Sequence, residues 1–199
     1  MDSSGRTPFL ICPPPPQVIE FRSMKRGPFE VLKSKNVYKN PWIDVREDEV
    51  VRPDGKPGIF GIVEMLPGVS VLPLDKDGFV YLTREFHYAV GTDSIEVVSG
   101  AIDEEENAVG AGRRELLEEL GIEAKEWIDL GYIDPFTTVV NSRDSMYLAK
   151  DLVFKSEGEK GIGVMKVKLE EAIGMVYDSK ITHGGSCVLI LKAARYLKL

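Results

Sequence analysis

Three glutamates stand at helical spacing between Gly100 and Ile122, and this feature constrains the chain more than any other. Glu115 and Glu119 are four residues apart, and Glu118 is three residues from Glu115. On an α-helix these side chains fall on one face, where like charges cost roughly 0.2–0.5 kcal/mol per pair. A cation between them reverses the sign of that interaction. Clusters of oxygen ligands suit Mg²⁺ or Mn²⁺, so the spacing predicts a metal site on a helix.

The segment 106–121 is predicted to be the clearest helix. The apolar positions that we expect to anchor it to a sheet are Val109, Leu116, Leu117 and Leu120. Gly121 supplies a stop signal. Gly110 and Gly112 each cost about 1 kcal/mol relative to Ala inside a helix, which indicates close packing or a functional requirement. The preceding acidic run, residues 103–105, is interpreted as a solvated surface.

The remaining pattern mixes strands and helices without a regular βα repeat, which excludes a simple Rossmann fold or barrel. Strands are expected within residues 29–70 and at 69–74, 79–83, 94–98, 127–132, 145–152 and 164–168, and further helices at 169–177 and 186–197. Residues 69–83 are predicted to form a β-hairpin around the turn at residues 75–78.

Composition limits the classes of partner. The chain has 25 Lys and Arg against 32 Asp and Glu, a formal net charge of −7, which argues against a nucleic-acid partner because such binding needs a basic face. A phosphorylated small molecule stays possible, since a divalent ion supplies local positive charge. We find no apolar run long enough to cross a bilayer and expect no membrane partner. Cys12 and Cys187 have no metal-site spacing, which favours reduced thiols and a cytoplasmic location.

The acidic window resembles the signature of the Nudix hydrolases at every fixed position. The match runs Gly100, five residues, Glu106, seven residues, Arg114-Glu115-Leu116, one residue, Glu118-Glu119, one residue, Gly121-Ile122. The resemblance implies an α/β Nudix fold, with a mixed β-sheet sandwiched between helices (α/β/α) and an N-terminal antiparallel β region. It also implies a pyrophosphohydrolase that uses two or three Mg²⁺ or Mn²⁺ ions.

The same resemblance implies residue roles. The implied metal ligands are Glu115, Glu118 and Glu119, joined by the backbone carbonyl of Ser99. Arg114 resembles an arginine that orients a carboxylate by a charge-assisted hydrogen bond, and Glu106 resembles a glutamate that supports the ligands. Gly100 is expected to permit a sharp turn. The general base is expected in a later loop, at Glu159 or Glu157 with Glu159 preferred; a solvated turn or a base within the signature helix is the alternative.

The flanking segments, residues 84–90 and 96–100, resemble the branch that hydrolyses ADP-ribose and other nucleoside diphosphate sugars to a nucleoside monophosphate and a sugar phosphate. Pro135 stands where that branch commonly has a proline. The substrate-binding residues implied are Arg84, His87, Glu96 and Phe136, with Arg46 or Trp42 contributed by the second subunit of a homodimer. His87 stands where the branch often has Arg, so it is either a substrate contact or an ordinary strand histidine. His183 is interpreted as part of a loop.

The domain organisation expected from these patterns has three parts. Residues 1–23, with four consecutive prolines at 13–16, are expected to be a disordered or vector-derived lead. Residues 24–70 are expected to form the dimerising β region, and residues 71–199 the Nudix catalytic domain. Two alternatives stay open: a Nudix hydrolase of GDP-mannose, a dinucleotide polyphosphate or an oxidised nucleotide, and a non-catalytic nucleotide-sugar sensor. The three intact glutamates argue against the sensor.

Overall fold

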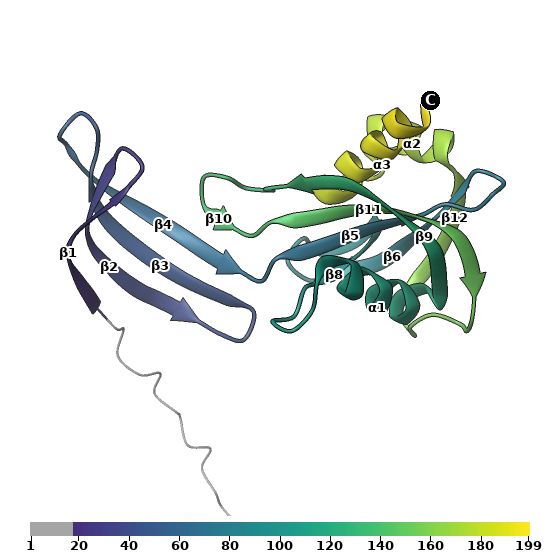
Figure 1. Cartoon of the computed structure of the whole chain (residues 1–199), viewed down its shortest axis with the longest axis horizontal. Helices are drawn as coiled ribbons and strands as arrows, with labels where there is room; N and C mark the ends of the chain where they lie inside the picture. The colour runs from purple at the N-terminus through teal and green to yellow at the C-terminus, as the bar shows by residue number, and fades with distance from the viewer. Residues whose placement is uncertain (1–17) are drawn as a thin grey trace, which may run out of the picture. The chain divides into compact units, whose positions relative to one another are not determined.

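The computed structural model describes residues 18–199, with side chains from residue 24 onward. The chain divides into two compact units, the first ending at Val63 and the second running from Glu64 to Leu199. The ribbon in Figure 1 shows strands throughout the first unit and both strands and helices in the second. None of the helices within residues 18–199 is long and apolar enough to cross a membrane.

The first unit is a sheet of four neighbouring strands, placed in chain order. These strands are β1 (Val18–Arg26), β2 (Phe29–Lys39), β3 (Ile43–Val51) and β4 (Pro57–Met65). β2 pairs antiparallel with both β1 and β3. Asn40 Oδ1 accepts hydrogen bonds from the backbone N–H groups of Trp42 and Ile43, which fixes the turn between β2 and β3. The N-terminal antiparallel region is therefore present.

The N-terminal boundary differs from the prediction. β1 begins at Val18 and pairs with β2, so residues 18–23 belong to the sheet and not to an unstructured lead. Ladder pairing with β2 gives their backbone groups partners that the local sequence pattern does not reveal. Residues 1–17 lie outside the described residues, so the rest of that prediction, including Cys12, stays a prediction.

The second unit contains two sheets and three helices. Its strands are β5 (Gly68–Pro73), β6 (Phe79–His87), β7 (Thr92–Glu96), β8 (Val98–Ala101), β9 (Ile122–Ile133), β10 (Val140–Asn141), β11 (Asp144–Phe154) and β12 (Gly163–Lys168), and its helices are α1 (Ala108–Leu120), α2 (Leu169–Tyr177) and α3 (Gly184–Leu197). One sheet has the order β8-β5-β11-β9 and is mixed, because β5 and β11 are parallel. The other has the order β12-β6-β7 and is antiparallel.

Two hydrophobic clusters place the sheets between the helices. On one side, α1 contributes Leu116 and Leu120 to a cluster with Val69 and Val71 of β5. On the other side, residues of α2 and α3 pack in a cluster with Leu72 of β5. Alternate residues of β5 thus face opposite helical layers, and Figure 1 shows α1 below the strands and α2 and α3 above them. The predicted α/β/α sandwich is confirmed.

The predicted hairpin at residues 69–83 is wrong in its pairing. The turn is present, because Asp75 Oδ1 accepts hydrogen bonds from the backbone N–H groups of Asp77 and Phe79. β5 and β6 nevertheless belong to different sheets and meet only at a bridge between Leu74 and Val80. β5 instead pairs with β8 and β11. The boundary between the units also differs from the prediction. It lies before β5, at residue 63, and not at residue 70.

Candidate active site

Helix α1 carries the three predicted ligands, and its ends are well capped. Asn107 Oδ1 accepts a hydrogen bond from the Gly110 N–H at 2.8 Å, which supplies a partner for one of the unpaired donors of the first turn. Gly121 ends the helix in the left-handed conformation at φ 65°. The buried side of α1 holds Leu116 and Leu120, whereas Leu117 is 39% exposed. Leu117 therefore does not anchor the helix, because one residue's rotation of about 100° takes it off the buried stripe.

Close packing of α1 against the sheet explains why a glycine stands at position 112. A Cβ at this position would lie 3.0 Å from Val71 Cγ2 and 3.2 Å from the Trp127 ring, so a side chain here would require Val71 and Trp127 to shift. Trp127 lies on β9 and packs against the cluster that α1 joins. The glycine thus allows the acidic helix to lie close to the sheet, although glycine is less favourable than alanine within a helix.

Arg114 donates hydrogen bonds to three acidic side chains. Its Nη1 donates to Glu115 Oε1 at 2.7 Å and to Glu118 Oε2 at 3.2 Å. Its Nη2 donates to Glu106 Oε2 and to the Ala101 carbonyl, each at 3.0 Å. The guanidinium lowers the pKa of Glu106 chiefly by these hydrogen bonds. Arg114 therefore ties α1 to the loop that precedes it and fixes the direction of two carboxylates.

The carboxylates of Glu115 and Glu119 lie in a poorly solvated environment. Burial is the largest cause that raises the pKa of each, and for Glu119 the negative charge of Glu115 adds to it, raising its pKa to about 8. The backbone N–H of Ser99 donates to Glu119 and partly opposes this rise. A Cβ at Gly100 would collide with the Glu115 carboxylate. The end of β8 therefore lies directly against both glutamates.

The loop after β11 docks on the C-terminal end of α1. The Lys155 N–H donates to the Gly121 carbonyl at 2.8 Å, and the Glu159 N–H donates to the Glu119 carbonyl at 3.3 Å. These bonds satisfy carbonyls that a helix end leaves unpaired. The charge of Glu159 is one of those that raise the pKa of Glu119, and that of Glu157 is not among them; both are exposed residues of this loop. Of the two predicted bases, Glu159 is thus placed beside the acidic helix.

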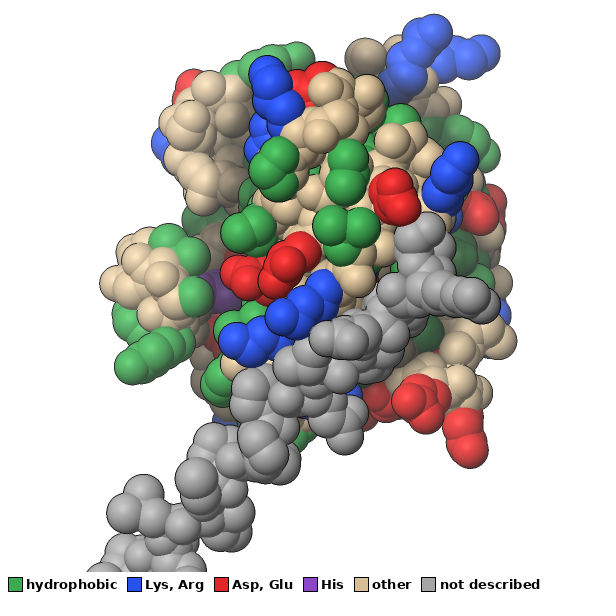
Figure 2. All heavy atoms as spheres, turned by 90° about the vertical axis from the view of Figure 1, so that its left-hand side faces the viewer, with side chains coloured by type: hydrophobic (Ala, Val, Ile, Leu, Met, Phe, Trp, Pro, Cys, Tyr) green, Lys and Arg blue, Asp and Glu red, His purple; other side chains and the backbone are tan. Residues whose placement is uncertain are grey.

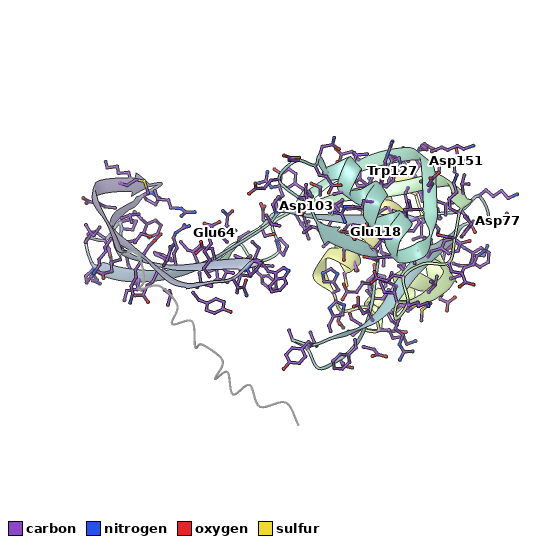
Figure 3. All side chains as sticks on the ribbon, turned by 90° about the horizontal axis from the view of Figure 1, so that it is seen from below. Glu64, Asp77, Asp103, Glu118, Trp127 and Asp151 are labelled. Carbon is purple, nitrogen blue, oxygen red and sulfur yellow. The ribbon has the colours of Figure 1, made fainter. Side chains whose placement is uncertain are left out.

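The donor set fits a divalent cation. Among the side chains of residues 24–199, no group of three Asp, Glu, His or Cys is already arranged to hold a metal ion, because the Arg114 guanidinium bridges Glu115 and Glu118. The charge of Glu115 nevertheless raises the pKa of Glu119 in a partly buried site, an unfavourable arrangement of like charge that a cation relieves. Figure 3 shows Glu118 on the same helix.

The predicted substrate-binding residues lie in different places. In the second unit, Arg84 Nη2 pairs with Asp93 at 3.0 Å, and Phe136 is 67% exposed after β9. His87 Nε2 lies 3.2 Å from Glu96 Oε1. Arg46 lies on β3 in the first unit, where its Nε is 3.3 Å from Asp48. Among the residues of the second unit, the structure therefore brings His87 and Glu96 together.

Two residues near the site were missed by the sequence reasoning. Glu85, two residues before His87 on β6, has a charge that raises the pKa of Glu119. His183 Nδ1 lies 3.1 Å from Glu96 Oε2. Strand alternation gave a signal for Glu85, because residues two apart share a face. His183 gave none, since its contact depends on how α3 packs.

An open pocket of about 630 Å³ lies elsewhere in the second unit. Its lining residues are Asp75, Lys76, Asp77, Tyr81, Lys125, Asp151, Leu152, Val153, Phe154 and Lys166. Figure 3 shows Asp77 and Asp151 at the far end of this unit from Asp103, with Glu118 between them. The lining includes none of the predicted site residues that the structure describes, so this pocket is separate from the acidic helix.

Comparison with known proteins identifies both units. The NUDIX domain model matches residues 65–166, and the model of the nucleoside diphosphate sugar hydrolase N-terminal domain matches residues 29–63. An ADP-ribose pyrophosphatase of Bacillus subtilis (strain 168) is 26% identical over 173 residues, covering 80% of this chain and 92% of that protein. An ADP-ribose pyrophosphatase of Mycobacterium tuberculosis is 26% identical over 132 residues, 65% of this chain and 63% of that protein. The solved structure of an ADP compounds hydrolase superimposes with a TM-score of 0.74 at 18% identity, covering 90% of this chain and 96% of that one, which shows a shared fold.

Proposed function

This chain belongs to the NUDIX family, and on that premise we propose that it hydrolyses the diphosphate of ADP-ribose or a related nucleoside diphosphate sugar. The observation that carries the proposal is the close approach of the Ser99–Gly100 backbone to the carboxylates of Glu115 and Glu119. The choice of substrate is supported by the match of residues 29–63 to a nucleoside diphosphate sugar hydrolase domain and by the two ADP-ribose pyrophosphatases it resembles.

The metal ions would be held by oxygen atoms of α1 and β8. The proposed ligands are Glu115, Glu118, Glu119 and the carbonyl of Ser99. Two or three Mg²⁺ or Mn²⁺ ions are proposed, since these cations take carboxylate and carbonyl oxygens. Such ions supply positive charge to a diphosphate and make a water more acidic. Arg114 would keep the Glu115 carboxylate in place through its 2.7 Å hydrogen bond.

Glu159 is the proposed general base. Its backbone N–H bonds to the Glu119 carbonyl, so its side chain starts from a backbone fixed to the metal-binding helix. The carboxylate would take one proton from water while the water oxygen bonds to one phosphorus. The bond between that phosphorus and the bridging oxygen breaks. With ADP-ribose, the products would be AMP and ribose phosphate.

The substrate would be oriented by residues of the second unit, with one residue from a second subunit. Arg84, His87 and Glu96 are proposed to face the sugar and diphosphate, and Phe136, which is largely exposed, to stack on the base. Arg46 stays in the proposal as a residue contributed by a second subunit. Its ion pair with Asp48 would have to loosen or reorient for that role.

A homodimer is proposed through the first unit. The exposed apolar side chains of its strands and turns include Leu32, Val37, Tyr38, Trp42 and Ile59. Figure 2 shows hydrophobic side chains lying among charged ones on the face turned toward the viewer. Burying such a surface against a second copy would be favourable. Light scattering after size-exclusion chromatography tests the pairing. A cytoplasmic location is also proposed. It is compatible with Cys187, which is a free thiol within the described residues.

A substrate panel tests the proposed function. ADP-ribose, ADP-glucose, GDP-mannose, diadenosine polyphosphates and oxidised nucleotides are incubated with Mg²⁺, Mn²⁺ or chelator, and the products are separated by chromatography. We expect metal-dependent release of AMP from ADP-ribose at the highest kcat/KM. A best rate with GDP-mannose or a dinucleotide would overturn the substrate assignment. Absence of turnover with tight ADP-ribose binding would favour a sensor.

A further inference from the structure

The two histidines of this chain contact the same buried carboxylate. His87 Nε2 lies 3.2 Å from Glu96 Oε1, and His183 Nδ1 lies 3.1 Å from Glu96 Oε2. Glu96 is 8% exposed. A carboxylate removed from water to this degree needs hydrogen-bonding partners, and each histidine occupies one of its oxygens. The contacts connect the end of β6 with the residue that precedes α3.

His183 is held in a closed ring of contacts. The Ser186 Oγ lies 2.9 Å from His183 Nδ1 and accepts a hydrogen bond from the Val97 N–H at 3.0 Å. Ser186 is fully buried, and Val97 directly follows Glu96 in the chain. The ring therefore runs from Glu96 through His183 and Ser186 back to the backbone beside Glu96. Buried networks in which every member has a partner hold their side chains in one arrangement.

The partners determine which ring nitrogens carry hydrogen. A carboxylate only accepts hydrogen bonds, so in any hydrogen bond with Glu96 the donor is His183 Nδ1 or His87 Nε2, which lie 3.1 Å and 3.2 Å from its oxygens. Ser186 Oγ can accept from His183 Nδ1 as well as from Val97, because a hydroxyl oxygen has two lone pairs. This assignment follows from the network of contacts. It leaves His87 Nδ1 and His183 Nε2 outside the network, and of these two nitrogens only His87 Nδ1 belongs to the strand that carries Glu85.

The strand that carries His87 runs past the acidic helix. Thr83 is paired with Glu96 across β6 and β7, and its Oγ1 donates to the Glu96 carbonyl at 3.3 Å. Two residues further on, the charge of Glu85 raises the pKa of Glu119. Alternate residues of a strand share a face, so His87 lies on the same face of β6 as Thr83, which contacts Glu96, and Glu85, whose charge acts on Glu119.

We infer that His183 is a positioning residue for substrate binding. It holds the Glu96 carboxylate, and Glu96 holds the His87 ring so that Nδ1 can accept a hydrogen bond from a hydroxyl group of the substrate. The identity of that substrate rests on the proposed function, whereas the linkage between the three side chains does not. Because His183 acts before the chemical step, its loss should weaken binding more than turnover.

Three variants of His183 test this role by kinetics. Asn places an amide nitrogen near the position of Nδ1, Gln places it further out, and Ala removes the donor. We expect His183→Ala and His183→Gln to raise KM for ADP-ribose about tenfold, the usual effect of losing a partner of a buried polar group. His183→Asn should stay within about twofold of the wild type, and kcat should change by less than about threefold in all three. Thermal unfolding confirms that each variant is folded at the assay temperature.

Equal KM values for the Asn and Gln variants, or a fall in kcat alone, would overturn the inference. A second readout is independent of activity. With two histidines in the chain, the ¹H–¹⁵N imidazole spectrum of an untagged protein contains two rings. His183→Ala should shift the His87 Nε2 signal, and His183→Asn should restore it. An unchanged His87 signal would contradict the linkage even if the enzyme cleaves ADP-ribose. A shifted signal in a protein that never cleaves ADP-ribose would refute the proposed function alone.

Discussion

The α-carbon of Gly100 lies directly against the side chain of Glu115, so that a Cβ at position 100 would collide with the carboxylate. The sequence pattern predicts a sharp turn at this glycine, but Gly100 is not among the residues with positive φ. Glycine is required at position 100 because there is no space for a Cβ, and not because the backbone needs a positive φ. The backbone of β8 and the Glu115 carboxylate therefore form one surface, which carries the proposed metal ligands.

Gly100→Ala should displace the Glu115 carboxylate and weaken metal-dependent activity. We expect apparent Mg²⁺ affinity to fall about 10- to 100-fold, the range typical of changes that disturb the support of a metal ligand. Mg²⁺ titrations of initial rate measure the effect. Gly174→Ala is the matched control, because nothing lies within 4 Å of a Cβ at that position in α2. Equal Mg²⁺ dependence of the two variants would contradict the role of Gly100.

Arg114→Lys should reduce kcat/KM about 10- to 100-fold. Lysine keeps the charge but cannot contact Glu106, Glu115 and the Ala101 carbonyl together as the planar guanidinium does. The neighbouring Arg113→Lys is the control, because Arg113 is exposed and lies 5.7 Å from the Trp127 ring centroid. Steady-state kinetics of the pair test the claim; a loss of the same size in both would show that general charge, and not this geometry, matters.

Glu119 should make the metal-free protein less stable as pH rises. Its pKa is raised from 4.5, the ordinary value for glutamate, to about 8 in the folded chain, so between these pH values the folded state binds more protons than the unfolded state. The stabilisation is complete below about pH 4.5 and is lost as pH rises through about 8, with each pKa unit worth about 1.4 kcal/mol. Urea unfolding in chelator from pH 5 to 9 measures the slope.

Glu119→Gln should flatten that slope, and a variant with the wild-type slope would contradict the assignment. The same proton must leave when a cation binds. Apparent Mg²⁺ affinity should therefore rise with pH up to about 8 and level off above it. Glu118→Gln, which changes an exposed carboxylate on the same helix, serves as the control for the stability measurement.

Glu159→Gln should lower kcat about 10²- to 10⁴-fold, the range expected for loss of a general base. Glu157→Gln should have little effect, because Glu157 belongs to the same loop but Glu159 is the residue bonded through its backbone to α1. The pH profile of kcat, measured with saturating metal, distinguishes a lost base from a distorted loop. Near-normal turnover in both variants would move the base into the signature helix.

The helices were largely predictable, because their signals are local. α2 has the predicted bounds, and α1 begins at Ala108 because Asn107 caps it. The pairing of β5 was not predictable, since a turn at residues 75–78 is equally compatible with a hairpin and with strands of two sheets. Which strands pair depends on contacts with β11, more than 70 residues away in the chain.

Some residues of the candidate site could likewise be predicted from local sequence, and others could not. Glu115, Glu118 and Glu119 follow from helical spacing alone, and Arg114 from the signature it shares with the family. The contact of His183 with Glu96 depends on the packing of α3, which no local pattern encodes. The distinction between Glu157 and Glu159 likewise required the docking of their loop on the end of α1.

The central claim is that α1 binds divalent cations through three glutamates, and Mn²⁺ binding followed by electron paramagnetic resonance tests it most directly. The variant Glu115→Gln/Glu118→Gln/Glu119→Gln is compared with Asp103→Asn/Glu104→Gln/Glu105→Gln, which removes the same charge from exposed residues of the preceding loop. We predict that the first variant loses the tight Mn²⁺ sites and the second retains them. Retention of tight Mn²⁺ binding by the first variant would contradict the account.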